Sequence, residues 1–222
     1  MKIDLHTHTW YSPDGVSPPE KIIRTVQKKR EKGLLDGIAV TDHNMIRAWK
    51  HFKNVDFPVV FGEEVKAMEE GRVKGDILGL FLTEEIKSRD AVTVVDEIHA
   101  QGGIAVIPHP FDKYRNGLGC PENIKKTIDG MEVFNSRMRA PSGNGKALAF
   151  AKKNHIAMTG GSDAHIRWEI GNAFTEAKSN NLEEFRKALE KRETRAVGRL
   201  SVEWILVPIT KFSKWGVIGR AL

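Results

Sequence analysis

The sequence predicts a single α/β domain whose largely parallel sheet curves into a barrel. Segments with strand-like and helix-like patterns alternate along the chain, which favours parallel strands joined by crossover helices. Residues able to bind metal follow the ends of successive predicted strands, and in a β/α barrel those ends open on one face. A chain of 222 residues with 40% hydrophobic content is large enough for one such domain.

The first predicted strand ends in a pair of histidines. Ile3 and Leu5 have the spacing of a buried strand face, and His6 and His8 follow them. Side chains two residues apart on a strand point to the same side, so the two imidazoles can bind one ion. The His-x-His pattern alone is weak, because short histidine pairs are common.

The first helix is predicted from its N-terminal signals. Residues 17–20 read Ser-Pro-Pro-Glu, a capping box with proline at the first helical position. Ile22, Ile23 and Val26 are expected to face the core, and the helix is expected to end near Gly33.

The remaining elements follow from short apolar runs, helical periodicity and turn residues. Further strands are predicted at residues 37–40, 58–61, 104–107, 130–134, 156–159, 172–177 and 195–197. Further helices are predicted through Trp49 and Phe52 and at residues 89–101, 142–153 and 182–191. Residues 65–82 are predicted to form a hairpin with its turn at residues 70–71, and the partly apolar tail, about residues 201–222, is predicted to dock on the barrel.

Ligand-type residues occur at or just after the ends of six of these strands. They are His6 and His8, His43, Glu64, His109, Glu132 and Asn135, and Asp163 and His165. Such a repetition is improbable by chance, so it indicates one shared site on the open face of the barrel.

Bulk properties limit the function classes. The net charge of +6 points only weakly to an anionic partner, because basic residues such as Lys28, Lys29 and Arg30 lie in predicted helices and indicate a solvated surface. One cysteine, Cys120, cannot form an internal disulfide, so a reducing cytoplasm is expected. No run of about 18 apolar residues exists and the N-terminus lacks an apolar signal region, so no membrane association is expected.

Several motifs together resemble the polymerase and histidinol phosphatase (PHP) superfamily. They are His6-x-His8 with a downstream Asp14, Thr41-Asp42-His43, Gly62-x-Glu64, His109-Pro110 and Gly161-Ser162-Asp163-Ala164-His165. The resemblance implies a distorted seven-stranded β/α barrel, a site for two or three divalent ions, and phosphoester hydrolysis. It covers the chain as one PHP domain, residues 1–222.

The resemblance also implies three metal positions. The first would use His6, His8, Glu64 and Asp163; the second Glu64 as a bridge with His109; the third Asp14, His43 and His165. This mixture of imidazole and carboxylate ligands suits manganese, zinc or iron.

One position departs from the family pattern. Relatives usually carry another histidine of the second position on the hairpin strand, where this chain has Asp76. Either Asp76 completes the second position and favours manganese or iron, or it faces water and leaves that position one ligand short.

Other polar residues have two readings each. Asp4 and Asp42 are predicted to orient histidines, whereas Glu132 and Asn135 would either do the same or contact substrate. The basic residues after two strand ends are either surface charges or a phosphate clamp; they are Lys113, Arg115, Arg137 and Arg139.

The predicted function is hydrolysis of a small phosphorylated substrate, such as a nucleotide, a sugar phosphate or a similar phosphomonoester. A hydroxide activated by the ions would attack phosphorus, with Glu64 and Asp163 holding metal and either His165 or a metal-bound water assisting the leaving oxygen. The nearest alternative is a 3′→5′ exonuclease acting on nucleic acid, but no interleaved basic and aromatic stripe is present. Further alternatives are an amidohydrolase-type enzyme, whose bridging lysine could not be placed, and a metal or phosphate sensor without activity.

Overall fold

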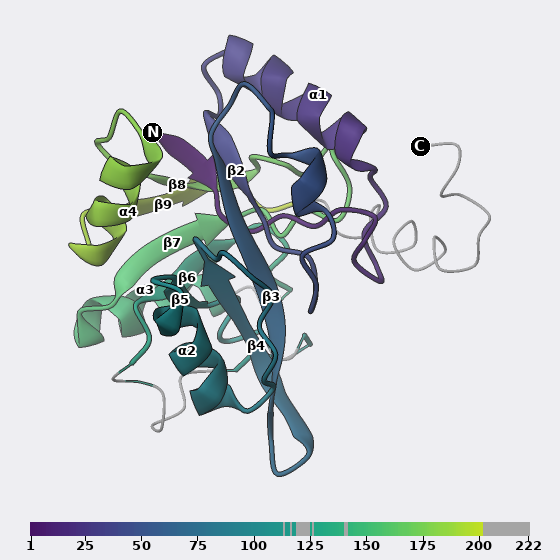
Figure 1. Cartoon of the computed structure of the whole chain (residues 1–222). Helices are drawn as coiled ribbons and strands as arrows, with labels where there is room; N and C mark the ends of the chain where they lie inside the picture. The colour runs from purple at the N-terminus through teal and green to yellow at the C-terminus, as the bar shows by residue number, and fades with distance from the viewer. Residues whose placement is uncertain (113, 116, 119–124, 126, 140–141, 202–222) are drawn as a thin grey trace.

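The computed structural model describes residues 1–112, 114–115, 117–118, 125, 127–139 and 142–201 (Figure 1). In these residues one mixed sheet of nine strands bends into a nearly closed barrel. The expected number of seven strands is therefore wrong for this chain. The sheet continues past β1 into two antiparallel strands, β8 and β9, which lie beside it.

The strands are hydrogen-bonded in the order β7-β6-β5-β4-β3-β2-β1-β8-β9. Their bounds are β1 (Lys2–Asp4), β2 (Gly37–Val40), β3 (Val59–Glu69), β4 (Arg72–Leu80), β5 (Ile104–Ile107), β6 (Gly130–Asn135), β7 (Ala157–Gly161), β8 (Ala173–Glu176) and β9 (Arg195–Gly198). The helices are α1 (Pro19–Glu31), α2 (Ala91–Ala100), α3 (Gly143–Asn154) and α4 (Leu182–Glu190).

The sheet contains two sets of parallel strands, and the strands of the predicted hairpin and of the β8–β9 end are antiparallel. β1, β2 and β3 run parallel, as do β5, β6 and β7. The hairpin of β3 and β4 turns at residues 70–71, as predicted, and reverses the chain, so β4 is antiparallel to both of its neighbours. The expectation of a largely parallel sheet holds for these two sets of strands only.

The barrel approaches closure where β7 meets β8. The amide of Gly160 donates to Thr175 Oγ1, and the same hydroxyl donates to the Gly160 carbonyl. A Cβ atom on Gly160 would lie 2.8 Å from the carbonyl oxygen of Phe174. Glycine at this position therefore allows the two strands to come close enough for the hydroxyl to join them.

The two faces of the sheet are both buried. On one face, residues such as Ile38 and Val40 pack with α1, α2 and α3. On the other, Ile3, Leu5 and Ala39 pack with Phe185 and other residues of α4. Alternating strand positions serve the two clusters, as expected for strands covered on both sides. Figure 1 shows α1 and α2 outside the curved sheet.

Two local predictions at helices are wrong. Ser17 does not cap α1: the N-cap is Pro18, and Ser17 Oγ instead accepts the amide of Arg167 at 2.8 Å. The predicted helix through Trp49 is only a 3-10 turn, η1 (Trp49–His51). The indole of Trp49 donates to the carbonyl of Gly62 at 3.1 Å, so a tertiary contact with β3 fixes this short segment.

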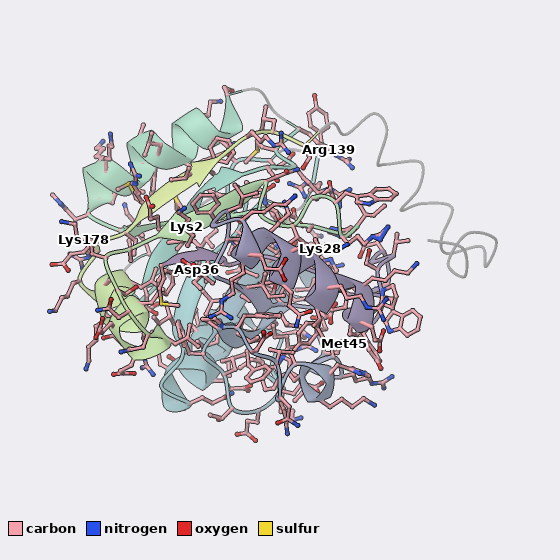
Figure 2. The ribbon with its side chains drawn as sticks, turned by 90° about the horizontal axis from the view of Figure 1, so that it is seen from above. Lys2, Lys28, Asp36, Met45, Arg139 and Lys178 are labelled. Carbon is pink, nitrogen blue, oxygen red and sulfur yellow. The ribbon has the colours of Figure 1, made fainter. Side chains whose placement is uncertain are left out.

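The basic residues are spread over the surface. Lys28, Arg139 and Lys178 are labelled at separate places in Figure 2, whereas Lys2 lies on β1 beside β8 and therefore near Lys178. No helix among the described residues is long and apolar enough to cross a membrane. The predicted tail segment, apart from residue 201, lies outside the described residues, as does Cys120.

Candidate metal centre

The backbone joins the segments that carry the predicted ligands. The amide of His8 donates to the carbonyl of Ala164, and the amide of Asp163 donates to the carbonyl of His6, both at 2.8 Å. A single parallel bridge likewise pairs His43 with Glu64. Residues far apart in the sequence are thereby held at one end of the barrel.

Four side-chain atoms converge at the centre of the site. The Nε2 atoms of His6 and His8 are 3.1 Å apart. Each lies 3.3 Å from Glu64 Oε2, and they lie 3.6 and 3.4 Å from Asp163 Oδ1. Two donor atoms that each lie about 2.0 Å from one zinc ion in a tetrahedral site are about 3.3 Å apart, and these five distances are of that size. The donor set thus fits a divalent ion.

Glu64 connects this group to two further histidines. Its Oε1 lies 3.1 Å from His109 Nε2, while its Oε2 lies 3.0 Å from His43 Nδ1. His6, Glu64 and His109 offer ligand atoms that all lie within 4.8 Å of one another. The geometry therefore suits the predicted bridge, with one carboxylate serving two neighbouring positions.

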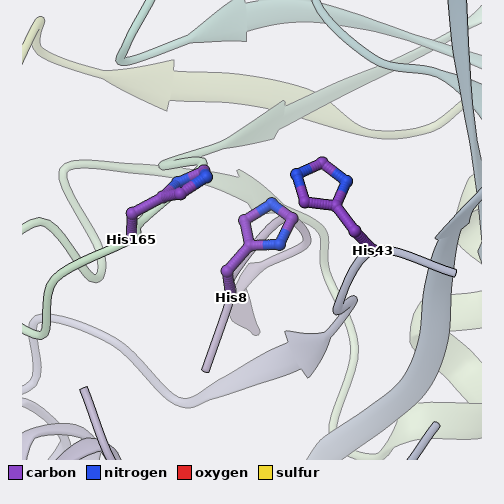
Figure 3. A group of neighbouring side chains, drawn as sticks. All are labelled: His8, His43 and His165. Atoms are coloured by element: carbon purple, nitrogen blue, oxygen red, sulfur yellow. The ribbon is translucent and has the colours of Figure 1, made fainter. Parts of the chain in front are cut away.

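A third group lies at the more open side of the site. His8, His43 and His165 turn their rings toward one another (Figure 3), with ligand atoms within 4.8 Å. Asp14 lies beside them, with its oxygens 3.7 Å from His43 Nε2 and 3.2 Å from His165 Nε2. The predicted third set is brought together, and His8 lies close enough to belong to it as well as to the first.

Hydrogen bonds explain which nitrogen His8 and His165 present. Ser12 Oγ donates to Asp42, so it can accept from His8 Nδ1 at 3.0 Å. Asp163 O accepts from His165 Nδ1 at 2.8 Å. In each case the proton is held on Nδ1, which leaves the Nε2 lone pair for a metal.

The residues predicted to orient the ligands do contact them or their backbone. Glu132 Oε1 lies 3.3 Å from His6 Nδ1, and its Oε2 accepts the amide of His109. Asn135 donates to Glu132 and to Asp163. Asp4 accepts backbone amides, among them that of His6 at 3.4 Å, rather than a ring nitrogen.

Arg115 is held by oxygen acceptors around the site. Its Nε donates to Asp112 at 3.0 Å, its Nη1 to Asp163 and its Nη2 to Asn135 at 3.1 Å. Arg115 therefore positions the second oxygen of Asp163, a contact that the sequence did not indicate.

The other predicted phosphate-clamp residues have different positions. Arg137 is buried, with Nε 3.6 Å from Glu169 Oε1. The amide of Arg139 donates to Asp112 at 3.1 Å, and Arg139 does not line the cavity of the site. Lys113 lies outside the described residues.

Buried charge is concentrated in the site. Burial opposes ionisation of Asp163, but Arg115 and His6 outweigh it and hold the pKa of this carboxyl well below its usual range. Burial also lowers the pKa of His8, yet bonds to Asp163 and Glu64 raise it overall to about 9. Burial, Arg137 and His8 lower the pKa of His165 to about 4, which keeps its imidazole neutral and suits a metal ligand better than a proton donor.

Asp76 faces the site from β4. Asp76 is 5% exposed, and its Oδ1 atom is buried with no hydrogen-bond partner among the described residues. Burial, then the charge of Glu64, raises the pKa of its carboxyl to about 6. A buried carboxylate oxygen without a partner is costly, and a cation beside it would remove that cost.

The site opens into a small cavity of about 270 Å³. Its lining consists of Asp14, His43, Glu64, Lys66, Asp76, His109, Tyr114, Arg115, Asp163 and His165.

Three supporting residues were missed by the sequence reasoning. Ser12 joins His8 to Asp42 and also accepts the amide of His43. Asp112 anchors the loop of Arg115, and Glu169 accepts the amide of His165 at 3.0 Å. None lies in a recognisable motif, since each acts through the approach of separate loops.

Two site residues have left-handed backbone conformations. His109 has φ of 30° and Asp163 has φ of 54°. Both follow parallel strands and turn their side chains into the site. Such conformations are uncommon for residues other than glycine.

Comparison with known proteins identifies the family. A family model described as PHP-associated matches residues 141–194. The uncharacterised protein MJ0417 of Methanocaldococcus jannaschii is 35% identical over 190 residues, covering 82% of this chain and 73% of the relative. A Bacteroides vulgatus two-domain protein described as containing a PHP-like metal-dependent phosphoesterase has a TM-score of 0.66 at 22% identity, covering 95% of this chain and 69% of that one. The chain belongs to the PHP superfamily.

Other matches carry different descriptions. MJ1587, also uncharacterised and from Methanocaldococcus jannaschii, is 36% identical over 163 residues, covering 67% of this chain and 90% of the relative. An amidohydrolase from Chromobacterium violaceum with bound sulfate has a TM-score of 0.65 at 17% identity, over 91% of this chain and 100% of that one. A lesion-specific endonuclease from Pyrococcus furiosus has a TM-score of 0.55 at 20% identity, over 86% of this chain and 56% of that one. At these identities the structures show a shared fold only.

Proposed function

We propose that this PHP protein is a metal-dependent phosphoesterase acting on small phosphorylated molecules. The observation that carries the proposal is the approach of Glu64 and Asp163 oxygens to within 3.3–3.6 Å of the His6 and His8 Nε2 atoms, extended by Glu64 toward His109. Manganese, zinc and iron all accept such ligands, and two or three ions would account for the three groups of donor atoms.

Divalent ions bound here would supply a water of lowered pKa and positive charge for the phosphoryl oxygens. The chain's own residues supply the alignment. Glu132, Ser12 and the Asp163 carbonyl fix three of the imidazoles through Nδ1. Arg115 and Asn135 hold the remaining oxygen of Asp163. These contacts hold the ligand atoms in place before substrate binds.

A small substrate is favoured by the dimensions and charge of the site. A cavity of about 270 Å³ is suited to a terminal phosphate and its immediate substituent rather than to a long polymer. The sequence has no interleaved stripe of basic and aromatic residues of the kind that binds a nucleic-acid strand. The side chain between the donor groups is Glu64, whose oxygens lie 3.3 Å from His6 and 3.1 Å from His109, rather than the bridging lysine of an amidohydrolase-type site. A cytoplasmic location stays a prediction from the single cysteine.

The test begins with metal analysis of the purified protein. Phosphomonoesters and phosphodiesters are then assayed with manganese, zinc and iron, before and after EDTA. Activity should disappear with the chelator and return with one of the metals. Hydrolysis that persists after elemental analysis shows the metal to be gone would contradict the proposal.

Salt dependence distinguishes the substrate classes. A site for one terminal phosphate should lose affinity only slightly between 50 and 200 mM salt, whereas binding several backbone phosphates would cost orders of magnitude. Tight, steeply salt-dependent binding of single-stranded DNA with processive degradation would favour the exonuclease instead.

A further inference from the structure

Lys66 is a cation of the cavity that the sequence patterns did not single out. It lies on β3 two residues after Glu64, so the two side chains point to the same side of the strand. It is half-buried and lines the cavity together with His43, His109 and Asp76.

The backbone at Lys66 is fixed relative to the metal ligands. Its amide donates to Asn44 Oδ1 at 3.0 Å, and the amide of Asn44 donates to the carbonyl of Glu64 at the same distance. Asn44 directly follows His43 and has a left-handed φ of 51°. The strand position of Lys66 is therefore tied to the end of β2, while its four-carbon side chain stays free to adjust.

The other basic side chains near the site are already engaged. Arg115 uses three nitrogens on Asp112, Asp163 and Asn135, and Arg137 faces Glu169. Arg139 has an interaction of its own as well. By contrast, the Nζ atom of Lys66 forms no hydrogen bond and no ion pair within 4.0 Å among the described residues.

We propose that Lys66 contacts the phosphoryl oxygens of the substrate. The inference rests on the proposed phosphoesterase function and assigns a substrate contact that the four clamp candidates from the sequence did not include. An ammonium group offers three donors and a compact charge, which suits a phosphate dianion beside bound cations.

A structural role is the competing explanation. Lys66 is directly opposite Asp76 in the pairing of β3 and β4, and opposite charges across strands stabilise a sheet slightly. In that case removal of the lysine would change thermal stability but not phosphate binding.

The experiment compares Lys66→Met with wild type, both loaded with manganese and checked for equal metal content. Inorganic phosphate binding is measured by titration calorimetry, and KM and kcat are measured on the best substrate of the panel. Lys66→Met should weaken phosphate binding roughly tenfold and raise KM, since a bond to a charged group contributes about that factor. Lys66→Arg should restore part of the loss.

The matched control is Lys74→Met. Lys74 belongs to the same hairpin but forms an ion pair with Glu69 at 2.9 Å, away from the cavity. Unchanged phosphate affinity in Lys66→Met, or no phosphate binding by the metal-loaded wild type, would overturn the assignment. If Lys66→Met weakens phosphate binding but no phosphoester is hydrolysed by wild type, only the proposed reaction fails.

Discussion

Asp76 shows how much can depend on one carboxylate. Its buried Oδ1 lacks a partner among the described residues, and it lines the same cavity as Glu64 and His109. A ligand role explains why a polar atom is buried there without a hydrogen bond. Oxygen is a harder ligand than imidazole, so this chain should prefer manganese or iron at the second position more than a histidine-containing relative would.

Asp76→Ala should therefore remove about one ion per chain, and Asp76→His should move the preference toward zinc while keeping turnover. Elemental analysis after dialysis against equal concentrations of the three metals measures both effects. The control is Asp96→Ala, an exposed position on α2. Wild-type metal content and rate in Asp76→Ala would mean that water fills the ligand position.

At the scale of elements, β3 serves two chemical environments. Glu64 faces the donor groups, whereas its neighbour Glu63 is fully buried and accepts the amide of Ile86 at 3.0 Å. Burial raises the pKa of Glu63 to about 7. Because a strand alternates its side chains, one strand supplies both the predicted bridging ligand and a titratable buried carboxyl.

This placement predicts a pH effect on stability. A carboxyl whose pKa is higher in the folded state stabilises the fold at low pH, and the contribution is lost as the pH rises through about 7. Between pH 5 and pH 8, the free energy of unfolding of wild type should fall by about 2–3 kcal/mol relative to that of Glu63→Gln.

Urea unfolding in EDTA, which keeps metal binding out of the comparison, measures the difference. Glu31→Gln, on the exposed surface of α1, is the control and should run parallel to wild type. If the unfolding free energy of Glu63→Gln also changes with pH in parallel with that of wild type, Glu63 does not titrate in this range.

Elements were predictable where the signal is local. The hairpin turn at residues 70–71 contains a glycine, and the short strands are runs of apolar residues; both are local signals of a hairpin and of buried strands. The capping box at Ser17 failed because a distant amide, that of Arg167, uses the hydroxyl. Tertiary contacts of this kind cannot be read from a single segment.

At the scale of the whole molecule, the predicted ligands come together because parallel strand ends meet on one face. His6 and Asp163 could be predicted from their positions after strands, whereas Glu64, expected just after a strand, lies within the longer β3. The structure brings oxygens of Glu64 and Asp163 within 3.6 Å of His6 Nε2. Ser12, Asp112 and Lys66 could not be predicted, since their places depend on loop approach and cavity shape. The metal-binding roles themselves stay predictions.

The candidate ligands are far apart in the sequence, from His6 to His165, so metal binding should be coupled to the stability of the whole fold. Manganese at about 100 times its dissociation constant should add about 2.7 kcal/mol per site, or about 5–10 °C in Tm. Glu64→Gln should lose most of this rise while keeping a similar Tm in EDTA. Differential scanning calorimetry checks both values, and an equal rise in the variant would rule out Glu64 as a shared ligand.

The left-handed conformations of His109 and Asp163 have a consequence for how such a protein evolves. Backbone strain of this kind costs on the order of 1 kcal/mol or more at each position and persists only where something else offsets it. Selection for folding alone would place glycine or asparagine at both positions. If the predicted metal role holds, a histidine and an aspartate there trade stability for ligand placement, and loss of that role would free these two positions to drift first.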